Sequence, residues 1–308
     1  MLKKILKSLQ NLLTLRWLSG RHFVIGVPFV WLAMAFLVPF LIVFRISFTG
    51  MENAGNPFGT LASYVDGIVH IKIKISNYLF IAEDDLYLLT YLSSLKYAAI
   101  TTMLCLFIGY PFSYFMARAK PSLRPTLMML VMLPFWTSFL LRIYAWKGIL
   151  ANHGILNELL LGMGLIAQPI HMMNTPFSLV LGMVYGYLPF MILPLYANLV
   201  KMDVRYLEAA ADLGATPMQT FWRITVPLSK SGIIAGSMLV FIPAIGEFVI
   251  PELLGGPETL MIGRVLWDEF FTNNDWPMAS AVTVVMILLI LVPMAIFNKY
   301  QTEQQGKV

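Results

Sequence analysis

Long apolar segments separated by short polar ones dominate the hydrophobic pattern of this chain. A transmembrane helix needs roughly 20 consecutive, mostly apolar residues, and six segments qualify: 23–44, 95–117, 126–146, 177–200, 231–251 and 277–297. Their apolar residues run continuously rather than alternating, which favours helices over a closed barrel, the other fold that satisfies its backbone in lipid. The pattern predicts an all-α, polytopic membrane protein with about six transmembrane helices.

The residues ahead of the first apolar segment have a different pattern. Leucine and isoleucine recur there at helical spacing, and Lys3, Lys4 and Lys7 take the opposite face, so we expect an amphipathic helix on the membrane surface within residues 1–22. The apolar segment that follows is too long for a signal peptide and lacks a small-residue cleavage site, which predicts that it stays in the protein.

The chain divides into four parts on this pattern. The amphipathic segment 1–22 precedes the first transmembrane helix and a long outer loop, 23–90. A transmembrane core over 91–298 and a short tail at 299–308 follow. Within the outer loop, the alternation Ile-Lys-Ile-Lys-Ile at 71–75 predicts a short strand.

The composition supports a lipid bilayer as the solvent of this chain. Hydrophobic residues make up 58% and charged residues 12%, whereas a soluble domain carries about 25% charged residues. Most of the 21 lysines and arginines fall on the inner side if both termini are cytoplasmic, as the positive-inside rule requires. No basic stripe interleaved with aromatic residues occurs outside the apolar segments, so nucleic acid is not expected as a partner.

The inner loop at 203–227, called the elbow below, is more patterned than a plain connection requires. It predicts two short helices with a break at Gly214, where a left-handed residue would end the first helix. Asp203 can cap the first helix, and Thr216 with Gln219 can form a capping box for the second. Such an elbow suits docking into a groove on a partner and, equally well, an amphipathic loop resting on lipid headgroups.

Six positions of the elbow resemble the EAA loop of bacterial ABC importer permeases. That loop reads Glu-Ala-Ala, three residues, Gly, nine residues and Ile-x-Leu-Pro. Here the spacing is kept and one valine replaces the leucine: Glu208, Ala209, Ala210, Gly214, Ile224, Val226 and Pro227. Other stretches resemble the polyamine branch of the family, most of all the first permease subunits of putrescine importers: 109–111, 133–142, 246–257 and 262–267.

The resemblance implies a type I ABC importer permease fold and a set of partners. The elbow would insert into a cytosolic ATPase subunit, with this contact carried by Glu208, Ala209, Ala210, Gly214 and Phe221. Two copies of that ATPase, a second permease subunit forming a heterodimer and a periplasmic polyamine-binding protein would complete an importer of the bacterial inner membrane. The chain has no phosphate-binding loop of its own, so ATP hydrolysis belongs to the partner, and no cofactor or catalytic residue is expected.

Glu247 is the one acid well inside a predicted transmembrane segment. An unpaired carboxylate in lipid is costly, so this side chain must face the protein interior or a water-filled path. It could contact a cationic substrate, or it could be a structural acid bonded to a neighbouring helix. Trp136, Tyr144 and Tyr187 could hold an alkyl ammonium through cation–π contacts, or they could pack or lie in the interfacial belt.

Other chemistries are disfavoured by the residues present. None of the four histidines lies inside a predicted span and the single cysteine, Cys105, lies in an apolar segment, so no metal site is expected. A membrane-embedded enzyme acting on lipid would need a catalytic cluster near the interface, and the sequence shows none. A secondary transporter would have no use for the elbow, while an ABC permease for a different small solute stays open beside the polyamine prediction.

Overall fold

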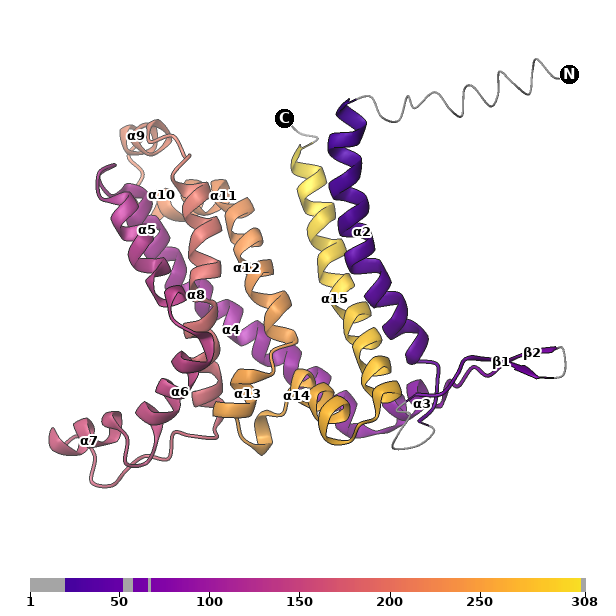
Figure 1. Ribbon diagram of the computed structural model, residues 1–308. Helices are drawn as coiled ribbons and strands as arrows, with labels where there is room; N and C mark the ends of the chain where they lie inside the picture. The colour runs from indigo at the N-terminus through magenta and orange to yellow at the C-terminus, as the bar shows by residue number, and fades with distance from the viewer. Residues whose placement is uncertain (1–19, 52–57, 66–67, 306–308) are drawn as a thin grey trace, which may run out of the picture.

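A computed structural model describes residues 20–51, 58–65 and 68–305 of the 308-residue chain. It confirms an all-α protein, to which one two-stranded antiparallel hairpin is added. Figure 1 shows long helices standing side by side, joined by shorter helices at both ends. The amphipathic helix predicted within residues 1–22 lies almost wholly outside the described residues.

Long and short elements alternate along the chain. The long helices are α2 (Gly20–Ile46), α4 (Asp85–Arg118), α8 (Pro176–Leu199), α12 (Lys230–Ile245) and α15 (Trp276–Gln305). The short elements are β1 (Ala62–Val65), β2 (Ile68–Ile71), α3 (Ser76–Glu83), α5 (Arg124–Met132), α6 (Phe139–Leu150), α7 (Ile155–Gly162), α9 (Arg205–Asp212), α10 (Pro217–Thr220), α11 (Val226–Leu228), α13 (Val249–Leu254) and α14 (Ile262–Trp267). Single 3₁₀ or π turns join several of them: η2 (Leu133–Trp136), η3 (Phe221–Thr225), η4 (Pro257–Thr259) and η5 (Asp268–Thr272).

Four of the described helices are long and apolar enough to cross a bilayer, and two bent pairs raise the number to six if each pair is one span. Four predicted spans fall on α2, α4, α8 and α15, which confirms those segments as single helices. The third and fifth predicted spans are each divided. The first bent pair covers the third span, whereas the second bent pair, Pro217–Leu228 with Lys230–Ile245, joins the end of the elbow to α12.

The third predicted span, 126–146, is not one helix. The chain bends by 85° between Arg124–Trp136 and Phe139–Gly162. Pro134 lies in a 3₁₀ turn, and Thr137 then leaves the helix with an extended backbone. The hydroxyl and the amide of Thr137 both donate to the Pro134 carbonyl, at 2.8 and 3.3 Å. These bonds satisfy the turn without continuing the helix. Pro134 also lacks the amide that would bond the Leu130 carbonyl, which weakens the helix just before the bend.

The fifth predicted span, 231–251, is divided as well. α12 ends at Ile245 and α13 begins at Val249, so Glu247 lies in a break between two helices rather than inside one. The apolar segment that contains Glu247 is therefore not one continuous helix, because Gly246 ends α12 and the Glu247 carboxylate accepts the first amides of α13.

The two strands of the hairpin lie before the alternating segment 71–75, for which a short strand was predicted. β1 pairs with β2 from Ala62–Ile71 to Val65–Ile68, so only the first residue of the predicted strand 71–75 belongs to a strand. Beyond Ile71 the chain changes partner, since the amide of Lys72 donates to Leu61 and that of Lys74 to Phe48. Alternation indicated an extended backbone here, but no single partner strand accompanies it.

The core lies where α4, α8 and α12 pack together. Cys105 of α4 and Val240 of α12 are fully buried in it. Gly232 and Gly236 place two small residues four apart on α12, and a Cβ added at Gly236 would lie 2.8 Å from the Met191 sulfur of α8. This Gly-x-x-x-Gly spacing lets the two backbones approach closely, as it does between other membrane helices.

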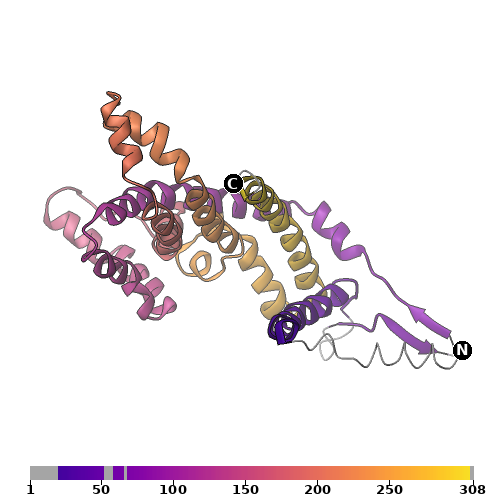
Figure 2. The same cartoon turned by 90° about the horizontal axis from the view of Figure 1, so that it is seen from above.

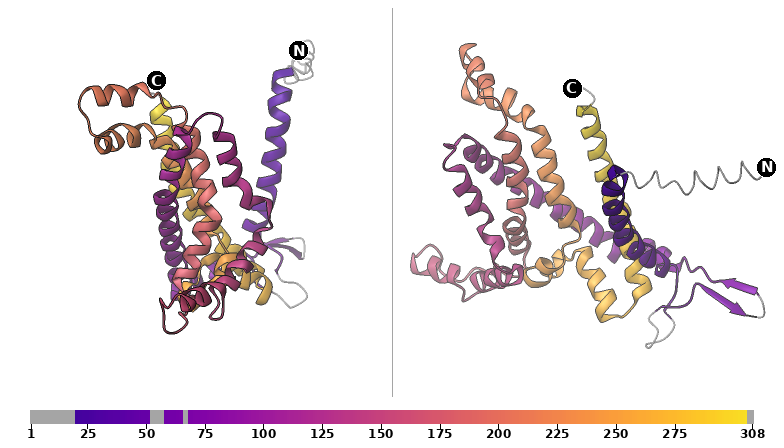
Figure 3. Two further views of the ribbon diagram at one scale, coloured as in Figure 1. Left: turned by 90° about the vertical axis from the view of Figure 1, so that its left-hand side faces the viewer. Right: turned by 45° about the horizontal axis from the view of Figure 1, so that its top comes forward.

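The two ends of the bundle differ in content. The Gly20 end of α2, the Gln305 end of α15 and the elbow helices lie at one end, and the hairpin, α7, α13 and α14 lie at the other (Figures 1 and 3). Seen from above, α2 and α15 form a pair beside the core (Figure 2). The apolar part of α2 has no buried residues in this chain, so its surface is left for lipid or for another subunit.

Candidate functional site

The first helix of the elbow is held at its start by an acid. An Asp203 oxygen accepts the amide of Arg205 at 3.0 Å, and the Arg205 guanidinium lies 2.6 Å from the second oxygen. Because the Arg205 side chain donates to this carboxylate, the pKa of Asp203 is held below its ordinary value. Both side chains are exposed, so the pair contributes little stability and serves mainly to orient the first turn.

The break between the two elbow helices has the predicted geometry. Gly214 has φ +78°, in the left-handed region. Its amide donates to Ala211 at 2.9 Å and the Ala215 amide donates to Ala210 at 3.0 Å, which together make a Schellman motif. The second helix starts with the capping box: Thr216 and Gln219 exchange side-chain and backbone bonds at 2.9 and 3.3 Å.

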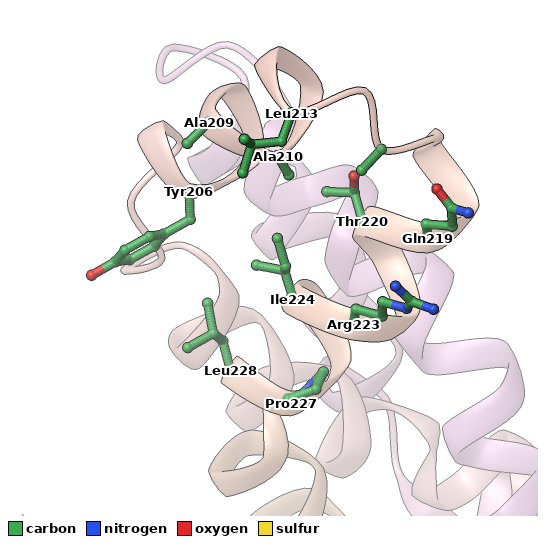
Figure 4. A pocket seen from close by; sticks show the side chains of 11 residues that line it. Tyr206, Ala209, Ala210, Leu213, Gln219, Thr220, Arg223, Ile224, Pro227 and Leu228 are labelled. Carbon is green, nitrogen blue, oxygen red and sulfur yellow. The ribbon is translucent and has the colours of Figure 1, made fainter.

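The two elbow helices enclose a hollow of about 600 Å³ (Figure 4). Its lining is mostly apolar: Tyr206, Ala209, Ala210, Leu213, Ala215, Gln219, Thr220, Arg223, Ile224, Pro227 and Leu228. Around it, Leu213 is 88% exposed and Met218 66%. Exposed apolar side chains gathered on one surface suit a contact with a protein partner or with lipid headgroups.

The predicted coupling residues do not all lie on the same surface. Glu208, Ala209 and Gly214 are exposed on the elbow, whereas Ala210 is buried. Phe221 turns toward the core and meets the ring of Tyr110 edge to face, with centroids 5.5 Å apart. The elbow therefore has an outward apolar surface and an inward aromatic anchor.

Glu247 is held by four donors. One carboxylate oxygen accepts the amides of Phe248, Val249 and Ile250 at 3.0 to 3.4 Å, which caps α13. The other oxygen accepts the hydroxyl of Tyr187 from α8. These bonds compensate the desolvation of the carboxylate and match the structural role weighed for it above. The role as a substrate contact stays a prediction.

The structure brings two of the four predicted pathway residues together. Tyr187 is buried and bonded to Glu247, whereas Trp136 and Tyr144 are 75% and 54% exposed. Trp136 lies at the bend of the third segment, and the neighbouring Phe135 meets Phe190 of α8 at 5.3 Å between centroids. Trp136 and Tyr144 are thus largely exposed, and neither contacts Glu247 through a hydrogen bond.

The sequence did not single out Gly263, which allows α14 to pack closely against the break at Glu247. A Cβ at Gly263 would lie 2.6 Å from the carbonyl oxygens of both Gly246 and Glu247, so only glycine allows the start of α14 to approach the break. The signal that could have identified Gly263 is its position within the stretch 262–267, which resembles the polyamine branch. Among the residues that the structure describes, no group of three or more His, Cys, Asp or Glu side chains is placed to hold a metal ion.

The segment that follows the break is held by polar and aromatic contacts. Glu252 lies 2.7 Å from the Arg264 guanidinium, and Glu269 accepts the Tyr87 hydroxyl at 2.8 Å. The Trp267 ring stacks on Phe248 with centroids 4.2 Å apart. These contacts link the start of α4 to the break that holds Glu247.

Fold and elbow together define a multi-pass membrane protein with an exposed helical elbow suited to a partner. Residues 106–302 match the family described as the binding-protein-dependent transport system inner membrane component. The chain belongs to this family, and it is a permease subunit of the ABC transporter type, not an enzyme.

Individual relatives agree with this assignment. The chain is 43% identical over 272 residues to the spermidine/putrescine transport system permease protein PotB of Haemophilus influenzae, covering 87% of this chain and 91% of PotB. PotB of Escherichia coli is 41% identical, covering 85% and 92%. These identities confirm the resemblance to the polyamine branch. A permease chain in the crystal structure of a bacterial alginate ABC transporter shares the fold, with a TM-score of 0.68, 15% identity and coverage of 92% and 96%.

Proposed function

We propose that this chain forms half of the translocation pathway of an ATP-driven polyamine importer, with putrescine as the preferred substrate and spermidine as the second. The observation that carries the proposal is the identity of 41–43%, over most of both chains, to permeases of spermidine/putrescine transport systems. The preference for putrescine rests on the resemblance of the stretches 109–111, 133–142, 246–257 and 262–267 to the polyamine branch, most of all to the first permease subunits of putrescine importers.

The elbow is the proposed site of the ATPase. Its exposed apolar residues and its hollow offer a surface on which a groove of a cytosolic subunit can close, and its rigid break fixes the angle at which it enters. We propose two ATPase copies, one on this chain and one on a second permease subunit that completes a heterodimer. A periplasmic polyamine-binding protein would dock at the opposite end of the bundle.

The proposed topology places the elbow, the start of α2 and the end of α15 in the cytoplasm of a bacterial cell, with the chain in its inner membrane. All three lie at the same end of the bundle (Figure 1), and most lysines and arginines fall on that side. Cysteines introduced singly at Asp84 and Gln219 and then labelled test this topology, because the native Cys105 is buried and should not react with the label. The first should react from outside only and the second from inside only. Labelling of both from one side contradicts the topology.

Glu247 with Tyr187 is the proposed cation contact in the pathway. The amides of α13 hold one carboxylate oxygen, and a polyamine ammonium would approach the second oxygen in competition with the Tyr187 hydroxyl. Trp136 and Tyr144 are exposed rings that can take the alkyl chain or a second ammonium. Such a site replaces part of the lost hydration without binding too tightly for release.

Uptake of labelled substrates tests the proposal. The chain is produced with its second permease, ATPase and binding protein in cells that lack other polyamine uptake, and putrescine, spermidine and an amino acid are compared. Uptake of both polyamines with putrescine preferred is expected, and it should vanish when the ATPase is inactivated. Uptake of the amino acid alone, or transport by this chain without an ATPase, contradicts the proposal.

A further inference from the structure

The point where the elbow joins α12 is tied to α4 by one buried hydrogen bond. The hydroxyls of Tyr110 and Ser229 lie 2.7 Å apart, and the two residues are 7% and 1% exposed. The Ser229 hydroxyl already donates its only proton to the Val226 carbonyl at 3.0 Å. Tyr110 must therefore be the donor and Ser229 the acceptor.

Ser229 lies at the junction between the elbow and α12. The chain bends by 66° between Pro217–Leu228 and Lys230–Ile245, with Ser229 at the corner. The π turn η3 leads into this corner, and such turns are rare and concentrate at functional sites. The buried Thr225 hydroxyl at the end of η3 has no hydrogen-bond partner among the described residues. The backbone bonds continue through the corner, since the amides of Ser229 and Ile233 donate to the carbonyls of Thr225 and Ser229. Contacts from outside the junction help to hold its position.

α4 provides those outside contacts at both ends of the junction. Before the bend, Phe221 meets the rings of Tyr110 and Tyr114 edge to face, at 5.5 and 6.2 Å between centroids. At the bend, Tyr110 holds Ser229. One turn further along α4, the Ser113 hydroxyl lies 2.7 Å from the Gly109 carbonyl of its own helix and 3.1 Å from the Ile192 carbonyl of α8, and its one proton is shared between them. The elbow is therefore connected through α4 to α8, the helix that carries Tyr187.

We propose that Tyr110 is a positioning residue whose hydroxyl makes the elbow and α4 move as one body. A ring contact alone permits sliding, whereas a buried directional bond at the corner fixes the angle between the two segments. The inference rests on the proposed function, since it assumes that an ATPase moves the elbow. When the bond is absent, the elbow would still follow the ATPase, but α4 would follow it less closely.

The test compares two tyrosines of α4 that both touch Phe221. Tyr110→Phe removes the bonded hydroxyl, while Tyr114→Phe removes a hydroxyl with no hydrogen bond to any residue that the structure describes. In the assembled transporter, Tyr110→Phe should leave assembly and ATP hydrolysis intact and lower substrate uptake per ATP hydrolysed about fivefold, the scale of one buried hydrogen bond. Tyr114→Phe should keep the wild-type ratio. Ser229→Ala should match Tyr110→Phe, and the double variant should be no worse than either one.

A second measurement is independent of the transported solute. Spin labels at Phe115 of α4 and Met218 of α10, both exposed, report the distance between α4 and the elbow. In the wild-type complex this distance should stay constant when ATP binds, and in Tyr110→Phe it should change or its distribution should broaden. A wild-type distance that changes as much as the variant's, or equal uptake ratios for the two tyrosine variants, overturns the inference. Failure of the complex to take up polyamines would instead contradict the proposed function, and the label distances would still decide the role of Tyr110.

Discussion

The chain interrupts its helices at Gly214 and at Glu247, and the two breaks are stabilised differently. At Gly214 every bond comes from residues a few positions away: the Schellman pair, the capping box and Asp203 all lie within the elbow. At Glu247 three amides that follow it also give local bonds, but the break adds a bond to Tyr187, 60 residues distant, and the close approach of Gly263. The elbow is therefore held by local bonds alone, whereas the Glu247 break is also tied to α8 and α14.

This difference suits the proposed roles. A segment that docks on a moving ATPase must transmit motion without deforming, which local bonds provide. A segment beside the pathway must change when the surrounding helices rearrange, which long-range bonds allow. Substitutions at Gly214 should therefore lower the coupling of transport to ATP hydrolysis, whereas substitutions at the Glu247 break should lower assembly and transport.

The largest effect is expected at Gly263. In Gly263→Ala the new Cβ would meet two backbone oxygens at 2.6 Å, which cannot shift like a flexible side chain. We expect a loss of about 2–3 kcal/mol of stability from this overpacking, seen as a lower unfolding midpoint of the purified complex. Gly148→Ala in α6 is the matched control, since a Cβ there has nothing within 4 Å. Equal midpoints for the two variants would show that the break tolerates displacement.

Gly214→Val should disturb the elbow without disturbing the core. Nothing lies within 4 Å of a Cβ at this position, so the cost is backbone strain alone, about 2 kcal/mol for a branched residue at φ +78°. Membrane insertion should be normal, and substrate uptake per ATP hydrolysed should fall. Gly214→Asn, which tolerates the left-handed region, should keep most coupling. Normal uptake by the valine variant at normal protein level would mean that the break is not needed.

Glu247→Gln tests the charge at the second break while keeping an oxygen that can cap α13. We expect assembly to persist and polyamine uptake to fall about tenfold, or about 1.4 kcal/mol in the transport barrier. Glu247→Leu removes the cap as well and should lower assembly. If Glu247→Gln transports normally and Glu247→Leu is lost through misassembly, the residue is structural and the proposed cation contact is refuted.

The smallest effect is expected from Thr216→Ala, which removes half of the capping box. Loss of an N-cap costs about 1 kcal/mol, and the Gly214 turn remains to position the second helix. Uptake should fall by no more than about twofold in a transport assay with the full complex. A complete loss would show that the second helix depends on its cap more than on the turn.

The sequence alone predicted the elbow in detail because its signals are local. Gly214, Thr216 and Gln219 each act on backbone groups within a few residues, so their spacing carries nearly all of the information. Four single-helix spans were predicted correctly for a related reason: a bilayer demands long apolar helices wherever they pack. The family resemblance also lay in the elbow, where the pattern is densest.

The tertiary structure decided where the other spans break and what the breaks contact. Hydropathy counts apolar residues and cannot distinguish a straight helix from one bent at Thr137 or divided at Glu247. The partner of Glu247 lies on α8, and that of Tyr110 lies at the corner before α12. Alternation at 71–75 likewise predicted an extended backbone but not its partner. Local bonds can be read from spacing along the chain, whereas a bond between distant residues exists only once packing has brought them together.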